Sequence, residues 1–283
     1  MKVNYVGDGK VFLLSGGGKV YTDVAARIVA SERSAKEIMM SEYSAKIVDN
    51  ILKSGHLAAT EFDNFLFLVE GYSRVCEVQL VRKRLASYLI KSGRVQLNGK
   101  REYSVVLPKS MKNDKACFTH IPFHKVYVKD SNDEMTTLFD SSVLTQSSFN
   151  LYLLNDHGLQ LDLNNDWYDQ MVEQGEKEQD LRYMKPQATE FRAIVGMNAH
   201  GLLDWFKIRL CKNAQDEIRD MAQRMFSLCK AAAPDLFKYA GPSCGVLGYC
   251  PEDNMMHPDC KKAGMYLPKT EALKVLSHYR IPF

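Results

Sequence analysis

A long stripe of apolar residues in the second half of the chain constrains the fold most. From about residue 198, apolar side chains recur at spacings of three and four, which places them on one face of a helix. The stripe consists of Leu202, Phe206, Leu210, Ala214, Ile218, Met221 and Met225. Pro234 cannot continue a helix and marks the end of the pattern. The sequence predicts one amphipathic helix of many turns, whose apolar face must be buried against other elements.

Cap and turn residues predict shorter elements elsewhere. Helices are predicted to begin at Thr22, Ser44 and Ser73, and Gly55 is a typical stop for the second of them. Strands are predicted at residues 65–69, 103–107 and 126–128, and a short helix at 271–278. Helices and strands occur without strict alternation, which indicates an α+β fold.

Composition narrows the class of protein. The chain has 283 residues, of which 46% are hydrophobic and 25% charged, as is usual for a globular protein with a sizeable core. A net charge of +3 is too small to indicate nucleic-acid binding. No run approaches the roughly 20 apolar residues of a membrane helix, and the first residues lack a signal-peptide core. We therefore expect a cytoplasmic protein with neither nucleic-acid nor membrane partners.

A basic segment follows the helix predicted after Ser73. Its cationic and small residues are Arg82, Lys83, Arg84, Ser87, Ser92, Gly93 and Arg94. Guanidinium groups match phosphate oxygens, and a Ser-Gly pair lets backbone N–H groups approach an anion. The segment can therefore hold a phosphorylated ligand. On composition alone, a solvated basic loop remains the alternative.

Two further arginines stand in distinctive places. Arg182 precedes Tyr183 and a proline, and Arg209 lies among apolar residues of the predicted long helix. A helical arginine in such surroundings commonly extends to solvent or pairs with an acid, here Asp204 or Glu217.

Two blocks of motifs occur in a fixed register. The first contains Gln79 and the basic segment. The second contains Arg182-Tyr183, Asn198-Ala199 and the run Ala-Gln-Asp-Glu-Ile-Arg at 214–219. Together they cover residues 50–95 and 180–235, and they resemble the flavin-dependent thymidylate synthases. The signature of that family is Arg-His-Arg, seven residues, then serine, with an arginine two positions further on.

The resemblance implies an activity and an assembly. Members of the family transfer the methylene of methylenetetrahydrofolate to carbon 5 of deoxyuridine monophosphate (dUMP). Reduced FAD supplies the hydride, NADPH restores the flavin, and no cysteine attacks the uracil. The family forms homotetramers with FAD sites between subunits, so we expect the same here.

The resemblance also assigns residues to sites. The substrate site would comprise Gln79, Ser92, Gly93, Arg94, Arg182 and Arg209. Within it, Ser92, Gly93 and Arg94 would hold the phosphate. Arg182 and Arg209 would be the catalytic pair, facing the base and stabilising its developing charge. The cofactor site would comprise His56, Arg82, Lys83, Arg84, Asn198, His200 and Asp204.

Several positions depart from the family pattern. Lys83 replaces a histidine, Ile90 a glutamate, Val95 an aromatic residue, His200 an arginine and Asp204 an asparagine. We expect position 90 to approach the ligand cleft, because it lies two residues before Ser92. The departures keep two alternatives open. One is a paralogue that modifies carbon 5 of another uridine nucleotide, and the other is a subunit that binds flavin or nucleotide without catalysis.

A cysteine-rich tail ends the chain. We predict a catalytic domain at 1–240, with an insertion at about 96–180, followed by the tail at 241–283. The tail carries Cys244, Cys250, His257 and Cys260, which could form a tetrahedral zinc site. The gap of five residues between the first two is wider than usual for zinc, so we favour reduced structural cysteines and no metal. A disulfide or redox pair is the third alternative.

Overall fold

The structure is a computed structural model whose described residues fall into two compact units. It describes residues 4–17, 20–91, 104–106, 126–129, 135–139, 174–175 and 187–278, together with 180, 183 and 185. One unit comprises residues 1–6 and 92–189, and the other comprises 7–91 and 190–283. The domain limits expected from the sequence stay a prediction.

The smaller unit contributes two pairs of short strands. In the first pair, β1 (Asn4–Tyr5) runs parallel to β5 (Ser104–Val105). In the second, β6 (Val126–Lys129) is antiparallel to β7 (Met135–Phe139). Strands were predicted from the sequence at β5 and β6, and both are confirmed.

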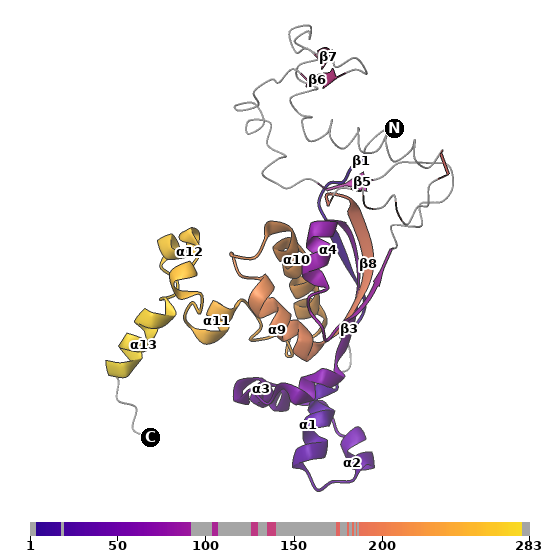
Figure 1. Ribbon diagram of the computed structural model, residues 1–283. Helices are drawn as coiled ribbons and strands as arrows, with labels where there is room; N and C mark the ends of the chain where they lie inside the picture. The colour runs from indigo at the N-terminus through magenta and orange to yellow at the C-terminus, as the bar shows by residue number, and fades with distance from the viewer. Residues whose placement is uncertain are drawn as a thin grey trace. The chain divides into compact units, whose positions relative to one another are not determined.

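The larger unit is built on a four-stranded antiparallel sheet (Figure 1). Its order is β2 (Lys10–Ser15), β3 (Asn64–Ser73), β8 (Glu190–Asn198) and β4 (Ser87–Ile90). Sheet and helices together confirm the α+β class. Sequence reasoning found the centre of β3 but missed β2, β4 and β8.

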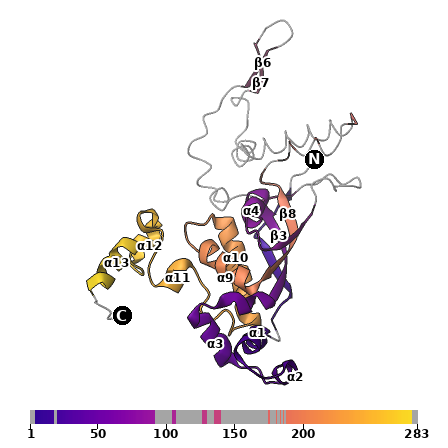
Figure 2. The same ribbon diagram turned by 60° about the horizontal axis from the view of Figure 1, so that its bottom comes forward.

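Three helices cover one face of this sheet. They are α4 (Arg74–Leu80), α9 (Ala199–Arg209) and α10 (Asp216–Ala232), and each contacts β3 or β8 (Figures 1 and 2). Side chains of a strand alternate between its faces. Accordingly, Phe65, Phe67 and Val69 of β3 are buried beneath the helices. The same covered face carries Val195 of β8, so the core lies between sheet and helices.

The apolar stripe of the second half is buried as predicted, but it belongs to two helices. Leu202 and Phe206 of α9 and Ile218 of α10 are fully buried. The chain turns between α9 and α10 because the Gln215 side chain accepts the backbone N–H of Ile218 and begins a new helix there. The guanidinium of Arg219 donates to the carbonyls of Lys212 and Ala214 in the turn. The prediction of one continuous helix is therefore wrong.

The first helices lie beside one another at the end of the sheet. They are α1 (Thr22–Ala30), α2 (Ala35–Met39), α3 (Ala45–Ser54) and the 3-10 helix η1 (Leu57–Phe62). Gly55 has φ 75° and ends α3, as predicted. The cap predicted for Thr22 is wrong, because the buried carboxylate of Asp63 accepts the backbone N–H groups of Tyr21 and Thr22 and the Thr22 hydroxyl.

The tail forms a series of short helices. They are α11 (Ser243–Leu247), η5 (Asp253–Met255), α12 (Pro258–Ala263) and α13 (Lys269–His278). Of these, α11 packs against α9. Among the helices that the structure describes, none has the length and apolarity needed to cross a membrane.

Candidate functional site

Arg209 is held where the ends of α4 and α9 meet. Its Nη2 donates to the backbone carbonyl of Gln79 over 3.1 Å. Burial, and then the neighbouring Arg82, lower the pKa of Arg209, but an arginine remains protonated in a protein. Two residues assigned to the substrate site, Gln79 and Arg209, thus come together, with a second cation, Arg82, nearby.

The acidic partners considered for Arg209 are engaged elsewhere. Glu217 accepts the backbone N–H and the hydroxyl of Ser73, and Asp204 pairs with Lys207. Pairing with an acid was one of the alternatives for Arg209, and among the described residues neither acid forms that pair. Within this part of the chain, the charge of Arg209 is available to a ligand.

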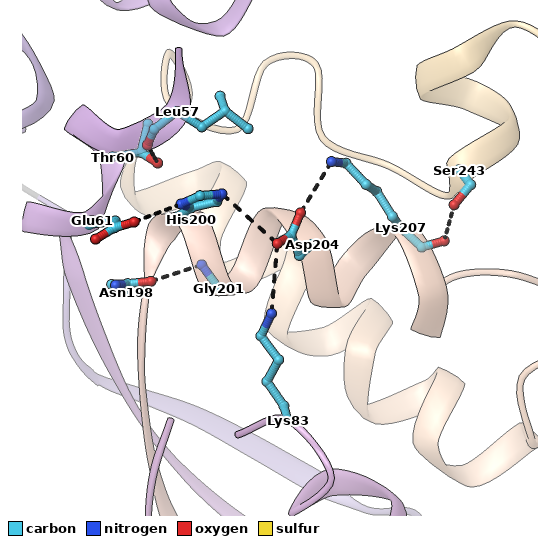
Figure 3. Close-up of polar contacts among 10 residues, drawn as sticks. All are labelled: Leu57, Thr60, Glu61, Lys83, Asn198, His200, Gly201, Asp204, Lys207 and Ser243. Atoms are coloured by element: carbon cyan, nitrogen blue, oxygen red, sulfur yellow. Dashed lines mark hydrogen bonds and ion pairs between the residues drawn. The ribbon is translucent and has the colours of Figure 1, made fainter. Parts of the chain in front are cut away.

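The basic segment runs along the first turn of α9. A Cβ at Gly201 would lie 3.4 Å from the carbonyl oxygen of Leu85 and 3.6 Å from Cε of Lys83. Asn198 caps α9 by accepting the Gly201 N–H over 2.8 Å (Figure 3). The hydroxyl of Tyr88 lies 2.9 Å from the carbonyls of both Leu80 and Lys83, and burial raises its pKa to about 12. Lys83 and Asn198, both assigned to the cofactor site, are thus fixed close together.

Three departures from the family pattern meet in one cluster of charges (Figure 3). Asp204 Oδ2 lies 3.8 Å from Lys83 Nζ and 3.9 Å from His200 Nε2, while its Oδ1 lies 3.2 Å from Lys207 Nζ. On its other side, His200 Nδ1 lies 3.1 Å from Glu61. Lys83 and Asp204 therefore compensate each other in charge, because the added carboxylate lies between Lys83 and Lys207, and His200 borders the same carboxylate. In the sequence these three departures are separate, but in the folded chain their side chains lie in one cluster.

Arg82 and Arg84 are the neighbours of Lys83 in the sequence, and both side chains are exposed. Within the part of the chain that the structure describes, neither forms a hydrogen bond or an ion pair. Free guanidinium donors match the oxygens of a pyrophosphate group, so this donor set fits the diphosphate of FAD. His56 is exposed at the start of η1, and among the described residues it contacts none of the other assigned ones.

Trp205 was missed from the sequence. It is 3% exposed, and no described residue accepts a hydrogen bond from its Nε1. It stands four residues after Gly201 and four before Arg209, so it shares their side of α9. That spacing could have identified it. A buried N–H without an acceptor is costly unless a ligand supplies one.

Four assigned residues lie outside the described part of the chain. They are Ser92, Gly93, Arg94 and Arg182. Their roles at the phosphate and the base stay predictions.

Ile90 lies in β4 opposite Ala193 of β8, and it packs partly buried against the core. Ser92 lies outside the described part of the chain, so the approach of position 90 to the ligand cleft stays a prediction.

A cavity of about 510 Å³ lies between the end of α9 and the tail. Cys211, Cys244, Cys250 and Cys260 all line it, as does His257. Burial raises the pKa values of Cys211 and Cys244, and Cys250 adds to the effect on both. As the side chains stand, no three His, Cys, Asp or Glu residues of the described segments converge on a point where a metal could bind. Cys211 was not grouped with the tail cysteines from the sequence, because it lies 33 positions before Cys244.

Comparison with known proteins identifies the family. The family described as thymidylate synthase complementing protein matches residues 17–235. A flavin-dependent thymidylate synthase of Clostridium tetani is 31% identical over 240 residues, covering 83% of this chain and 84% of that protein. Another, of Pyrococcus abyssi, is 33% identical over 218 residues, covering 75% of each chain.

A solved structure supports the fold. The UMP/dUMP methylase PolB of Streptomyces cacaoi, bound with 5-Br dUMP, has a TM-score of 0.60. It is 14% identical, and the match covers 83% of this chain and 95% of that one. At this identity the likeness concerns the fold alone. Together with the family match and the relatives, it leads to one conclusion: the chain belongs to the flavin-dependent thymidylate synthase family.

Proposed function

We propose that this protein catalyses the reductive methylation of dUMP to dTMP, with methylenetetrahydrofolate as carbon donor, FAD as cofactor and NADPH as reductant. The observation that carries the proposal is the placement of Arg209. Its guanidinium is half-buried, fixed on the Gln79 carbonyl and, among the described residues, without an acidic partner.

The chemistry needs such a cation. Carbon 5 of uracil becomes nucleophilic as negative charge develops on the ring. A preorganised guanidinium stabilises that charge without having to reorganise during the reaction. Because Arg209 is held by a backbone carbonyl, its orientation is set before the substrate arrives.

The cofactor would lie along the basic segment and the first turn of α9. Arg82 and Arg84 would hold its diphosphate, while Lys83, Asn198 and the cluster around Asp204 would border it. When bound, FAD supplies the hydride that reduces the transferred methylene to a methyl group. Trp205 offers an N–H donor on the same side of α9.

The compensated cluster argues against a catalytically degenerate subunit. Random loss of a site leaves unpaired charges, whereas Asp204 is paired with both Lys83 and Lys207. A second candidate function is the methylation of another uridine nucleotide. Lys83, His200 and Asp204 favour it, because they alter the surroundings of the ligands.

One experiment tests the proposal. Purified protein is incubated with FAD, NADPH, methylenetetrahydrofolate and dUMP labelled with tritium at carbon 5, and released tritium is measured. We expect release that requires all three added factors and is faster with dUMP than with UMP. Faster release with UMP would favour the second candidate, and no release from either nucleotide by flavin-loaded protein would contradict both.

We further propose that the protein works as a homotetramer in the cytosol. The sheet face opposite the helices carries Phe12, Leu14, Leu66 and Leu89, which are 46%, 50%, 36% and 71% exposed. Phe12 pairs with Leu68, which continues to Ile194 and Leu89 in one row across the sheet. An apolar row of this kind is typical of a surface covered by another subunit. The six cysteines of the described segments are free thiols, which suits a reducing compartment.

A charge placed in this row should disrupt the assembly. Phe12→Lys is expected to shift the protein to smaller species in sedimentation velocity, because burying an unpaired ammonium between subunits is costly. Val29→Lys serves as control, since Val29 is 89% exposed on α1. An unchanged sedimentation coefficient for Phe12→Lys would remove this face from the subunit interface.

A further inference from the structure

The cavity between α9 and the tail gathers four of the six cysteines in the described part of the chain. Cys211 comes from the turn after α9, Cys244 from α11, Cys250 from the segment that follows it, and Cys260 from α12. Four separate segments thus present a thiol to one space. Neither the proposed reaction nor the candidate site uses any of them.

The tail is fastened to the rim of this cavity by polar contacts. The Ser243 hydroxyl donates to the carbonyl of Lys207, and Asn213 donates to the carbonyl of Met255 over 2.8 Å. Lys212 pairs with Asp259 across 3.3 Å. These contacts keep the segments that carry the thiols facing one another.

His257 lines the same cavity but is unsuited to be a ligand. Its Nδ1 accepts the backbone N–H of Asp259 over 3.2 Å and caps α12. A neutral imidazole whose Nδ1 accepts a hydrogen bond carries its proton on Nε2, which then has no lone pair for a metal. The zinc ligand set considered as an alternative from the sequence, with His257 as fourth ligand, is therefore replaced here by one with Cys211.

The surrounding charges suit four thiolates. A divalent cation bound by four thiolates carries a net charge of −2. The cavity is lined by Lys207, Arg209 and Lys212 together with Glu252 and Asp259, so its charged side chains carry one net positive charge that would offset part of the −2. Tetrahedral coordination by sulfur is the arrangement that Zn²⁺ adopts in structural sites.

We propose that Cys211, Cys244, Cys250 and Cys260 form a four-thiolate site for a structural zinc ion. The thiols now line the cavity without converging on a point, so binding must draw them inward. Rotation about χ1 redirects a thiol without moving the backbone. Gly248 and Gly264, with φ of 77° and 61°, end α11 and α12 and let these short helices shift toward α9.

Zinc in this position would fix the end of α9. Cys211 stands two residues after Arg209, so the ion would tie the tail to the segment that carries the proposed catalytic arginine. Four thiolates leave no open coordination position, so the ion has no direct part in the reaction. The proposal does not rest on the proposed function, because metal content is measured without substrate.

The test is the metal content of the full-length protein. Wild type and variants are loaded with zinc, desalted and analysed by mass spectrometry. We expect about one zinc ion per chain in wild type and in His257→Ala, and at least a tenfold loss in Cys211→Ser and Cys250→Ser. Cys229→Ser is the matched control, because Cys229 is buried in the core away from the cavity.

A second measurement covers the case in which a cysteine variant fails to fold. Wild-type protein loaded with Co²⁺ should show the absorption of a tetrahedral site with four sulfur ligands. Absence of stoichiometric zinc in wild type would overturn the proposal. So would a cobalt spectrum of mixed nitrogen and sulfur ligation, or full zinc content in folded Cys211→Ser.

Discussion

Replacing Arg209 by alanine is expected to lower kcat for tritium release from labelled dUMP by about 100-fold. The guanidinium is half-buried and held on the Gln79 carbonyl, so its orientation is fixed before the substrate binds. Its interaction with the uracil strengthens as negative charge develops, and the loss should therefore fall on kcat more than on KM. Arg209→Lys keeps a charge but loses the planar donors, and only partial recovery is expected.

Two controls separate this effect from a structural one. Lys230→Ala removes another cation from the neighbouring helix α10, where Lys230 lies over the ring of Phe226, and it should leave kcat unchanged. Flavin absorption of Arg209→Ala should match that of wild type. If kcat of a correctly folded Arg209→Ala stays within about twofold of wild type, Arg209 is not a catalytic residue.

Local patterns were sufficient for much of the fold. The helices after Ser44 and Ser73 begin where they were predicted, although only the Ser73 side chain forms the cap hydrogen bond. The centre of β3 is where its apolar run lies. The apolar stripe identified the buried faces of α9 and α10. These features depend on residues a few positions apart, which sequence periodicity reports directly.

Long-range contacts account for the failures. Asp63 begins α1 from 41 positions away, and no pattern around Thr22 reveals it. The break between α9 and α10 depends on Gln215, which caps α10 through the backbone N–H of Ile218. The apolar stripe continues across this break, so the sequence pattern predicted one helix. Buried and more exposed residues alternate along part of β8, as is typical of a strand. The sequence analysis used this segment only for its motif residues, so it did not predict the strand.

In the candidate site, too, individual residues could be predicted from the sequence, whereas the contacts between distant residues could not. The resemblance identified Gln79 and Arg209, and the structure brings them into contact. It also named Lys83, His200 and Asp204, but only as separate departures. Their compensation depends on the basic segment crossing the first turn of α9 at Gly201, which is a property of the folded chain.

Ile90 gives the clearest test of the folded arrangement, because the family usually has glutamate there. Ile90→Glu is expected to lower the free energy of unfolding by about 3 kcal/mol, since the carboxylate would lie against the apolar core. Lys83→His, another reversion to the family pattern, should change stability by under about 1 kcal/mol, because the ion pair between Lys83 and Asp204 is partly exposed.

Urea unfolding at one protein concentration and with saturating FAD measures the effect, because ligand and assembly both shift apparent stability. Lys91→Glu is the matched control: it introduces the same side chain one residue further on, at an exposed position, and should change stability by under about 0.5 kcal/mol. An Ile90→Glu protein as stable as wild type would mean that position 90 faces the ligands after all, and its kcat/KM for dUMP and UMP would then report on nucleotide choice. With the side chain packed against the core opposite Ala193, the expected result is instead a loss of stability that is the same whether or not nucleotide is present.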